Sequence, residues 1–164
     1  MFTTDVMTRE RDPTVLEEPQ NLGFKKANVD VIKRAMVGVT QGGTGTRVFA
    51  GARYVSGGKT GTAQAVTIGQ KDKYNSKKLE EHQRDHALYI AFAPAEDPRI
   101  AVAVIVENAG WGAGVAAPIA RRVFDYWLNG EYPSEEDLTA VRKGQATAPI
   151  GKPRRVEDIP LTAP

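Results

Sequence analysis

Apolar and polar residues recur with two periods along this chain, and each period predicts a different kind of element. Residues 28–41 carry apolar side chains at helical spacing, and two glycines follow, which predicts a helix that stops there. Residues 87–93 and 100–106 are apolar, β-prone runs separated by a Glu-Asp-Pro-Arg turn, which predicts an antiparallel hairpin. Their nearly continuous apolar character predicts strands that are covered on both faces.

The remaining segments complete an α+β order of elements. Residues 52–66 are predicted to be extended, and a long polar stretch, 67–86, follows them. A second helix is predicted over about 117–129, ended by Gly130, with an apolar face made of Ile119, Val123, Tyr126 and Trp127. We therefore expect an antiparallel sheet flanked by helices. Three strands make a thin core, which favours part of a larger sheet domain.

Changes in composition divide the chain into three parts. Residues 1–24 are charged and irregular, and residues 25–130 hold the predicted helices and strands. Residues 131–164 contain four prolines after Lys143 and little apolar periodicity, so we predict a disordered tail there. The basic residues between Lys152 and Arg155 are interpreted as part of that solvated tail.

Charge and composition exclude several classes of function. With 22 Lys and Arg against 20 Asp and Glu, the net charge of +2 does not favour nucleic acid as a partner. Without cysteine, neither a disulfide framework nor a thiolate zinc site is possible. No run approaches the roughly 18 apolar residues that a spanning helix needs, and the N-terminus lacks the apolar core of a signal peptide. Any membrane anchor is expected to lie outside this sequence.

The most informative segment is Gly58-Lys59-Thr60-Gly61-Thr62-Ala63-Gln64. On a strand the side chains alternate between the two faces, so Lys59 is expected on one face and both threonines on the other. Glycine between the two threonines lets a ligand backbone lie close to the strand. Such a surface suits an extended peptide that ends in a carboxylate, with hydroxyls, strand N–H groups and a cation to hold it.

This segment and several others resemble the transpeptidase domain of class B penicillin-binding proteins, most closely the rod-elongation subfamily called penicillin-binding protein 2. Lys-Thr-Gly is a known signature of penicillin-binding proteins and β-lactamases. The resemblance covers about residues 25–129, and its other segments are Tyr74-Asn75, Arg84-Asp85-His86, Ala91-Phe92-Ala93-Pro94 and Val104-Ile105-Val106-Glu107-Asn108. It implies the β-lactamase/transpeptidase-like fold.

The resemblance also implies roles for individual residues. Lys59 would help proton transfer beside a catalytic serine, and the backbone N–H of Thr62 would donate to the oxyanion. Thr60, Gly61 and Thr62 would bind the donor peptide or a β-lactam through its carboxylate and backbone. Tyr74 and Trp111 are candidate groove-lining residues, for which a solvated loop and a packing role, respectively, are equally good explanations.

Two motifs that the family needs are absent from this chain. The family carries Ser-x-x-Lys on a helix and Ser-x-Asn on a loop, and the serines here are Ser56, Ser76 and Ser134 only. Ser56 has Lys59 three positions later, but two glycines stand between them, and on a strand these side chains point to opposite faces. We therefore expect the nucleophile upstream of residue 1, and no acylation by this chain alone.

Two other patterns are weaker. His82 and His86 are four residues apart, but no Glu directly follows His82 and no third ligand is apparent, so no metal site is predicted. The run Gly42–Thr46 follows a helix and lacks the Gly-Lys-Ser/Thr of a phosphate loop, so we interpret it as a connecting turn.

The leading hypothesis is the C-terminal part of a serine D,D-transpeptidase that cross-links peptidoglycan stem peptides. Its expected ligands are the D-Ala-D-Ala terminus and β-lactams, without a cofactor, and its expected partners include a glycosyltransferase of the elongation machinery. The expected location is the periplasmic face of the bacterial inner membrane. Two alternatives stay open: a non-catalytic peptide-binding module of the same fold, and a β-lactamase or D,D-carboxypeptidase relative.

Overall fold

The computed structural model describes residues 20–65, 80–145, 148–155 and 157. The chain divides into two compact units, residues 1–30 and 31–164. In the first unit Lys26 begins helix α1 (Lys26–Gln41), and its ammonium pairs with Asp30 one turn later at 2.6 Å. The helix begins two residues before the predicted start and stops at the predicted glycines.

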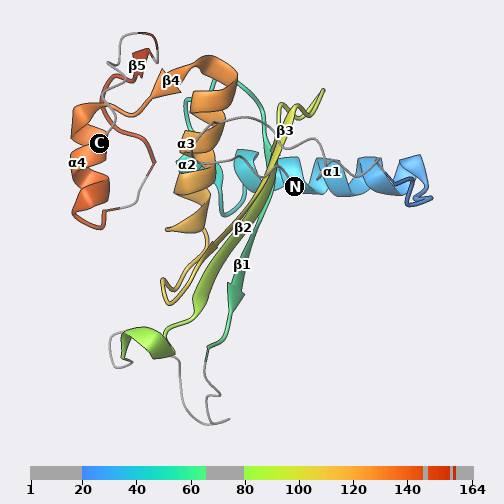
Figure 1. The fold of residues 1–164 in the computed structure, drawn as a ribbon. Helices are drawn as coiled ribbons and strands as arrows, with labels where there is room; N and C mark the ends of the chain where they lie inside the picture. Colours follow the sequence, from blue (N-terminus) through green and yellow to red (C-terminus); the bar gives the residue numbers. More distant parts are fainter. Residues whose placement is uncertain (1–19, 66–79, 146–147, 156, 158–164) are drawn as a thin grey trace, which may run out of the picture. The chain divides into compact units, whose positions relative to one another are not determined.

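The second unit contains a three-stranded antiparallel sheet in the order β1-β2-β3 (Figure 1). Strand β1 is Gly57–Ala63, β2 is His86–Ala93 and β3 is Ile100–Val106. The predicted hairpin is thus confirmed to within one residue, and the α+β fold class is confirmed with it. Strand β1 is shorter than the predicted extended segment and lies at one edge of the sheet. A short 3-10 helix, η3 (Glu81–Gln83), precedes β2.

Helix α3 (Ala116–Asn129) packs against the sheet, as Figure 1 shows. The contact surfaces are made mainly of small side chains, so helix and strands approach closely. The buried alanines are Ala87, Ala91 and Ala93 from β2 and Ala116, Ala117 and Ala120 from α3. Phe49, from the short helix α2 (Thr46–Phe49), completes the core, with its ring centroid 6.1 Å from Tyr89 and 6.4 Å from Phe124.

Helix α3 buries a different face from the one that its large apolar residues predict. Ile119, Val123, Tyr126 and Trp127 are 38–60% exposed. The buried face holds small residues, Phe124 and the ion pair of Arg121 with Asp125. This face of α3 is the buried one because its alanines permit a close approach to the sheet, and because the two buried charges neutralise each other. Gly130 ends the helix as predicted, with φ of 63°.

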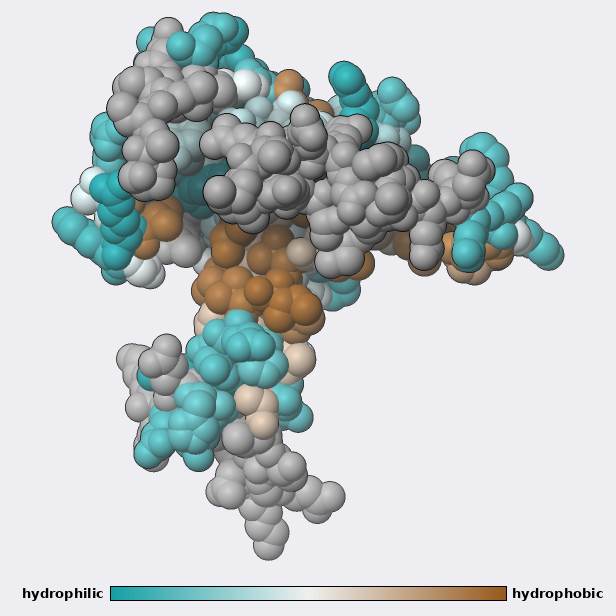
Figure 2. Space-filling view, in the orientation of Figure 1, coloured by the Kyte–Doolittle hydropathy of each residue, from teal (hydrophilic) through white to brown (hydrophobic). Residues whose placement is uncertain are grey.

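The sheet face opposite α3 is partly open. Ile90 is 51% exposed and Ile105 is 66% exposed, although both lie within strands. Figure 2 shows apolar surface gathered where the sheet and the adjoining end of α3 lie. The sequence predicts strands covered on both faces, and in the described chain α3 covers only one of them.

Two glycines allow aromatic rings to lie against strand β1. A Cβ built on Gly58 would overlap the hydroxyl of Tyr89, whose side chain is fully buried. A Cβ on Gly57 would lie 2.5 Å from Cζ of Phe92. Burial raises the pKa of Tyr89 to about 12, so its phenol stays neutral beneath the strand.

We expect Gly58→Ala to lower the free energy of unfolding by about 1–3 kcal/mol, because the added methyl overpacks a buried aromatic contact. Urea unfolding measures this change. Gly38→Ala is the matched control, since Gly38 lies in α1 with no atom within 4 Å of its Cβ position. The control is expected to gain about 0.5–1 kcal/mol from helix propensity. Equal effects of the two substitutions would contradict the packing explanation.

The described residues after α3 contain further helix and strand, whereas the sequence predicts disorder for residues 131–164. Strand β4 (Glu131–Tyr132) pairs with β5 (Arg154–Arg155), and helix α4 (Glu135–Arg142) lies between them in sequence. Ser134 caps α4 by accepting from the N–H of Asp137 at 3.0 Å. Polar contacts of this kind produce no apolar periodicity, so the pattern of hydrophobic residues does not reveal them.

Candidate functional site

Strand β1 presents the Lys-Thr-Gly residues as the sequence predicts, on an extended backbone. Thr60 stands opposite Tyr89 and Thr62 opposite Ala87 in the register, so both threonines face the side that α3 covers. Lys59 stands opposite Ile90 on the other face. Lys59 and Thr62 are exposed and Thr60 is half-buried. Among the described residues β1 pairs with a strand on one side only, so its outer backbone edge has no strand partner there.

A third hydroxyl, from the turn that follows α1, lies beside those of Thr60 and Thr62. Oγ1 of Thr44 is 3.3 Å from Oγ1 of Thr60. The sequence interpretation treated this Gly-Thr segment as a connecting turn and did not identify Thr44. No sequence pattern signals the contact, because the two threonines are 16 residues apart and only the fold brings them together. Nζ of Lys59 donates to the carbonyl of Thr60 at 2.5 Å.

The glycine loop after β3 lies directly against β1. A Cβ built on Gly112 would overlap the carbonyl oxygen of Leu88 and lie 2.5 Å from that of Gly61. Gly61 and Leu88 are register partners. Both oxygens lie within 2.5 Å of the same point, so the Gly61 carbonyl points toward β2. The N–H of Thr62 belongs to the same trans peptide group as the Gly61 oxygen, so it points the opposite way, toward the open edge.

Of the two candidate groove-lining residues, the structure describes Trp111 and not Tyr74. Trp111 is 63% exposed, and its carbonyl accepts from the N–H groups of Gly114 at 3.0 Å and Val115 at 3.1 Å. The turn therefore holds its backbone while its indole stays in solvent. Tyr74 lies outside the described residues, so its role remains a prediction from the sequence.

Ser56 is placed where it cannot act as a nucleophile for an external substrate. It is 2% exposed and directly precedes β1, whereas Lys59 is exposed on the strand. Its carbonyl accepts from the hydroxyl of Thr40 at 2.5 Å, which ties the strand to α1. This burial supports the rejection of Ser56 and Lys59 as a Ser-x-x-Lys pair.

The two histidines do not share a helix face. His82 lies in η3, whereas His86 begins β2 and accepts at Nδ1 from the N–H of Asn108 at 3.0 Å. Within the part of the chain that the structure describes, no three His, Asp or Glu side chains are grouped to hold a metal ion. In the same residues, no helix combines the length and apolar character needed to cross a bilayer.

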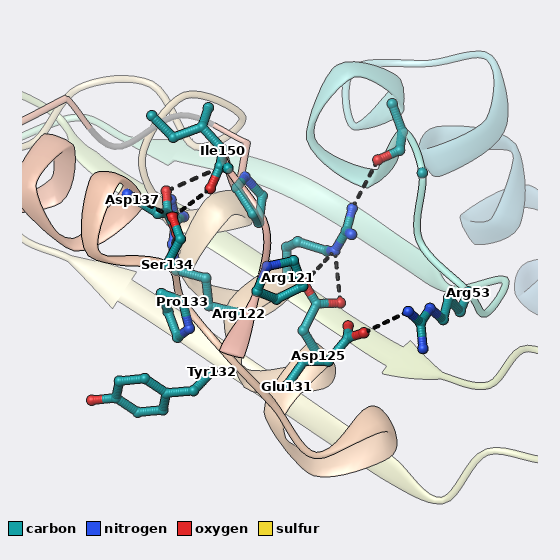
Figure 3. A pocket seen from close by; sticks show the side chains of 15 residues that line it. Arg53, Arg121, Arg122, Asp125, Glu131, Tyr132, Pro133, Ser134, Asp137 and Ile150 are labelled. Carbon is teal, nitrogen blue, oxygen red and sulfur yellow. Dashed lines mark hydrogen bonds and ion pairs between the residues drawn. The ribbon is translucent and has the colours of Figure 1, made fainter. Parts of the chain in front are cut away.

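A cavity of about 290 Å³ lies away from β1, between α3 and the C-terminal elements (Figure 3). Its charges are paired: Nε of Arg121 donates to both carboxylate oxygens of Asp125, at 2.9 and 2.8 Å. The same guanidinium donates to the carbonyls of Val48 and Ala50. Arg53 pairs with Glu131 at 3.1 Å.

Tyr54 belongs to the same polar network, because its hydroxyl donates to Oδ1 of Asp125 at 2.9 Å. Burial, and next the charge of Asp125, hold the pKa of Tyr54 well above its usual range. The donors and acceptors around this cavity are thus committed to one another. We interpret the network as a structural connection between α3, the α2 segment and the C-terminal elements, and not as a ligand site.

Comparison with known proteins identifies what these elements are similar to. The family model described as the penicillin binding protein transpeptidase domain matches residues 5–125. The peptidoglycan D,D-transpeptidase MrdA of Haemophilus influenzae is 44% identical over 114 residues, and that of Acinetobacter baumannii is 47% identical over 118 residues. The crystal structure of Pseudomonas aeruginosa PBP2 in complex with WCK 5153 aligns with a TM-score of 0.53 and 42% identity.

These matches cover most of this chain and a small part of each relative. The alignments span 68% and 70% of the chain, but 18% of the H. influenzae protein and 17% of the A. baumannii protein. The P. aeruginosa structure covers 67% of the chain, which corresponds to 21% of that structure. The chain thus spans about a fifth of the length of each of these relatives.

Proposed function

The chain belongs to the penicillin-binding protein transpeptidase family, and we propose that it forms the C-terminal part of a serine D,D-transpeptidase that cross-links peptidoglycan and binds penicillin. The observation that carries this proposal is the open edge of β1. That edge combines two threonine hydroxyls, the outward N–H of Thr62 and the Lys59 ammonium at its other face. An extended peptide that ends in D-Ala-D-Ala fits such an edge as an added strand.

The residues of β1 take different parts in acyl transfer. The hydroxyls of Thr60 and Thr62 hold the terminal carboxylate of the donor peptide, or the carboxylate of a β-lactam. When the serine oxygen attacks the carbonyl carbon, negative charge develops on the carbonyl oxygen. The Thr62 N–H donates to that oxygen, together with the N–H of the nucleophile itself. The C–N bond then breaks, and the leaving amine departs with a proton.

Lys59 supports the proton transfers of this reaction from the opposite face of β1. Its long stem is exposed and already bends along the strand, because Nζ reaches the carbonyl of Thr60. An ammonium at this position places a transferable proton and a positive charge next to the serine system. The serine and its neighbouring lysine belong to the upstream part of the parent protein.

We also propose a wider setting for the parent protein, which the family membership supports. The parent is anchored in the inner membrane by a segment outside this chain, and its transpeptidase domain lies in the periplasm. It works with a glycosyltransferase that supplies the glycan strands and with other proteins of the elongation machinery. The similarity to two MrdA proteins at 44% and 47% identity supports this assignment over a β-lactamase or carboxypeptidase.

Labelling with a fluorescent penicillin tests the proposal directly. The isolated chain of 164 residues is expected to stay unlabelled, and the full-length protein that contains it is expected to form a covalent adduct. The reason is that the chain supplies the substrate strand without the nucleophile. Gel fluorescence after denaturation separates covalent from reversible binding.

Prior incubation with unlabelled penicillin is the control, and it should abolish the signal of the full-length protein. If the full-length protein binds a D-Ala-D-Ala peptide but never labels, the non-catalytic peptide-binding module is the better description. Labelling of the isolated chain would show that the nucleophile lies within these residues, contrary to the proposal.

A further inference from the structure

The contact between the glycine loop and β1 has no space for a side chain at one position. Gly112 is buried, and the position of its absent Cβ falls among backbone atoms of both β1 and β2. Those atoms are the carbonyl oxygens of Leu88 and Gly61 and, at 3.3 Å, the nitrogen of Gly61. Backbone atoms of a sheet cannot move aside as a flexible side chain would, because the ladder hydrogen bonds hold them.

The loop that carries Gly112 is itself anchored at both ends. The N–H of Gly110 donates to the carbonyl of Asp85 at 2.7 Å, just before β2. The carbonyl of Gly112 accepts from the N–H of Ala117 at 2.9 Å, in the first turn of α3. These two hydrogen bonds hold the backbone of Gly112 close to the Gly61 peptide group. The loop thus connects α3 to the substrate strand through backbone contacts.

The peptide group that the loop contacts is the one that matters for the chemistry. The oxygen of Gly61 and the N–H of Thr62 are opposite ends of one planar unit. A displacement of that oxygen therefore tilts the N–H by a comparable amount. The position of the N–H toward the developing oxyanion has to be held to a fraction of an ångström.

We propose that Gly112 is a positioning residue of the transpeptidase, whose bare backbone sets the orientation of the Gly61–Thr62 peptide group and hence of the oxyanion donor. The role rests on the proposed function, because an oxyanion donor has meaning only in an acyl-transfer enzyme. Gly112 touches neither substrate nor nucleophile in this role. It acts only through the strand.

Acylation kinetics of the full-length protein test the role of Gly112. We expect Gly112→Ala to lower the first-order acylation rate constant with penicillin by about 10²-fold, comparable to the loss of one oxyanion donor. The dissociation constant of the precovalent complex should change much less, because the threonine hydroxyls still hold the carboxylate. Gly114→Ala is the matched control in the same loop, since its Cβ would meet the Trp111 ring at an ordinary 3.4 Å.

The fraction of protein that becomes labelled distinguishes a positioning role of Gly112 from a simple loss of stability. A variant that is only less stable would show a smaller labelled fraction and an unchanged rate constant in that fraction. A second variant covers the case in which Gly112→Ala does not fold: one glycine inserted between Trp111 and Gly112 lengthens the loop without adding a Cβ. It should stay folded and acylate about 10-fold or more slowly, because the loop no longer holds Gly112 close to β1.

The outcomes distinguish the two proposals. If the unaltered full-length protein does not acylate, the proposed function fails. If it acylates and the folded Gly112 variants keep its rate constant, the positioning role is wrong. A rate lowered equally by Gly114→Ala would also overturn it, since the effect would then belong to the loop as a whole.

Discussion

Replacing Lys59 by alanine in the full-length protein is expected to lower the rate of acylation by penicillin about 10³-fold. A positioned acid or base contributes about 10²–10⁴-fold to proton transfer, and Lys59 is proposed to serve the serine system in this way. Lys59 is exposed, and its described hydrogen bond goes to the neighbouring Thr60 carbonyl. The substitution should therefore change the rate and leave the unfolding temperature nearly unchanged.

Stopped-flow or time-resolved labelling measures the acylation rate of this variant. Lys33→Ala is the matched control: Nζ of Lys33 lies 5.8 Å from the ring centroid of Phe92, near the same strands, so the control removes one positive charge without touching β1. We expect the control to acylate within about 3-fold of the unaltered protein. Lys59→Arg keeps the charge but not an easily transferred proton, and it should remain slow. An unchanged rate for Lys59→Ala would remove Lys59 from the site.

Replacing Asp137 by alanine is expected to destabilise the C-terminal elements by about 3–5 kcal/mol, because it leaves the charge of Arg122 without its buried partner. The carboxylate is 1% exposed and accepts from Nε and NH2 of Arg122 at 2.9 and 2.6 Å. Its backbone N–H also forms the cap with Ser134. Amide hydrogen exchange should show faster exchange in α4, while the amides of β2 keep their protection.

Two controls make this prediction specific. Glu135 lies in α4 like Asp137, and Glu135→Ala removes its exposed ion pair with Arg154 of β5. This substitution should lower the free energy of unfolding by less than about 1 kcal/mol. The double substitution Arg122→Met with Asp137→Leu replaces the pair by apolar side chains and should recover most of the lost stability. If Asp137→Ala behaves like Glu135→Ala, the buried pair does not hold the C-terminal elements in place.

The candidate site shows which features of an enzyme strand can be predicted from sequence. Alternation along an extended backbone places Lys59 opposite the two threonines, and this follows from local geometry alone. The rejection of Ser56 followed from the same alternation and from two glycines, and its burial agrees with it. The contacts of Thr44 and Gly112 with β1 join residues 16 and about 50 positions apart, so no local pattern announces them.

Residues 131–164 show a case in which composition and apolar periodicity do not predict the structure. Sequence statistics associate scattered prolines and low apolar periodicity with disorder, because such segments bury too little apolar surface to offset their ordering entropy. In the structure α4 is held by the charge of Arg122, the cap of Ser134 and the bond from the Ser134 hydroxyl to the carbonyl of Ile150 at 2.8 Å. The cap is local, because Ser134 and Asp137 are three residues apart, but the other two contacts join residues 15 and 16 positions apart.

The amino-acid sequence by itself determined α1, α3, the hairpin, the extended segment with its Lys-Thr-Gly residues, and the family, because these depend on periodicity and short motifs within a few neighbouring positions. Only the tertiary structure decided which face of α3 is buried, that β4, α4 and β5 form after α3, and that the Gly61–Thr62 peptide lies against Gly112. Those features depend on distances between segments remote in sequence. Their energies come from packing density and from the pairing of buried polar groups, which no single segment contains.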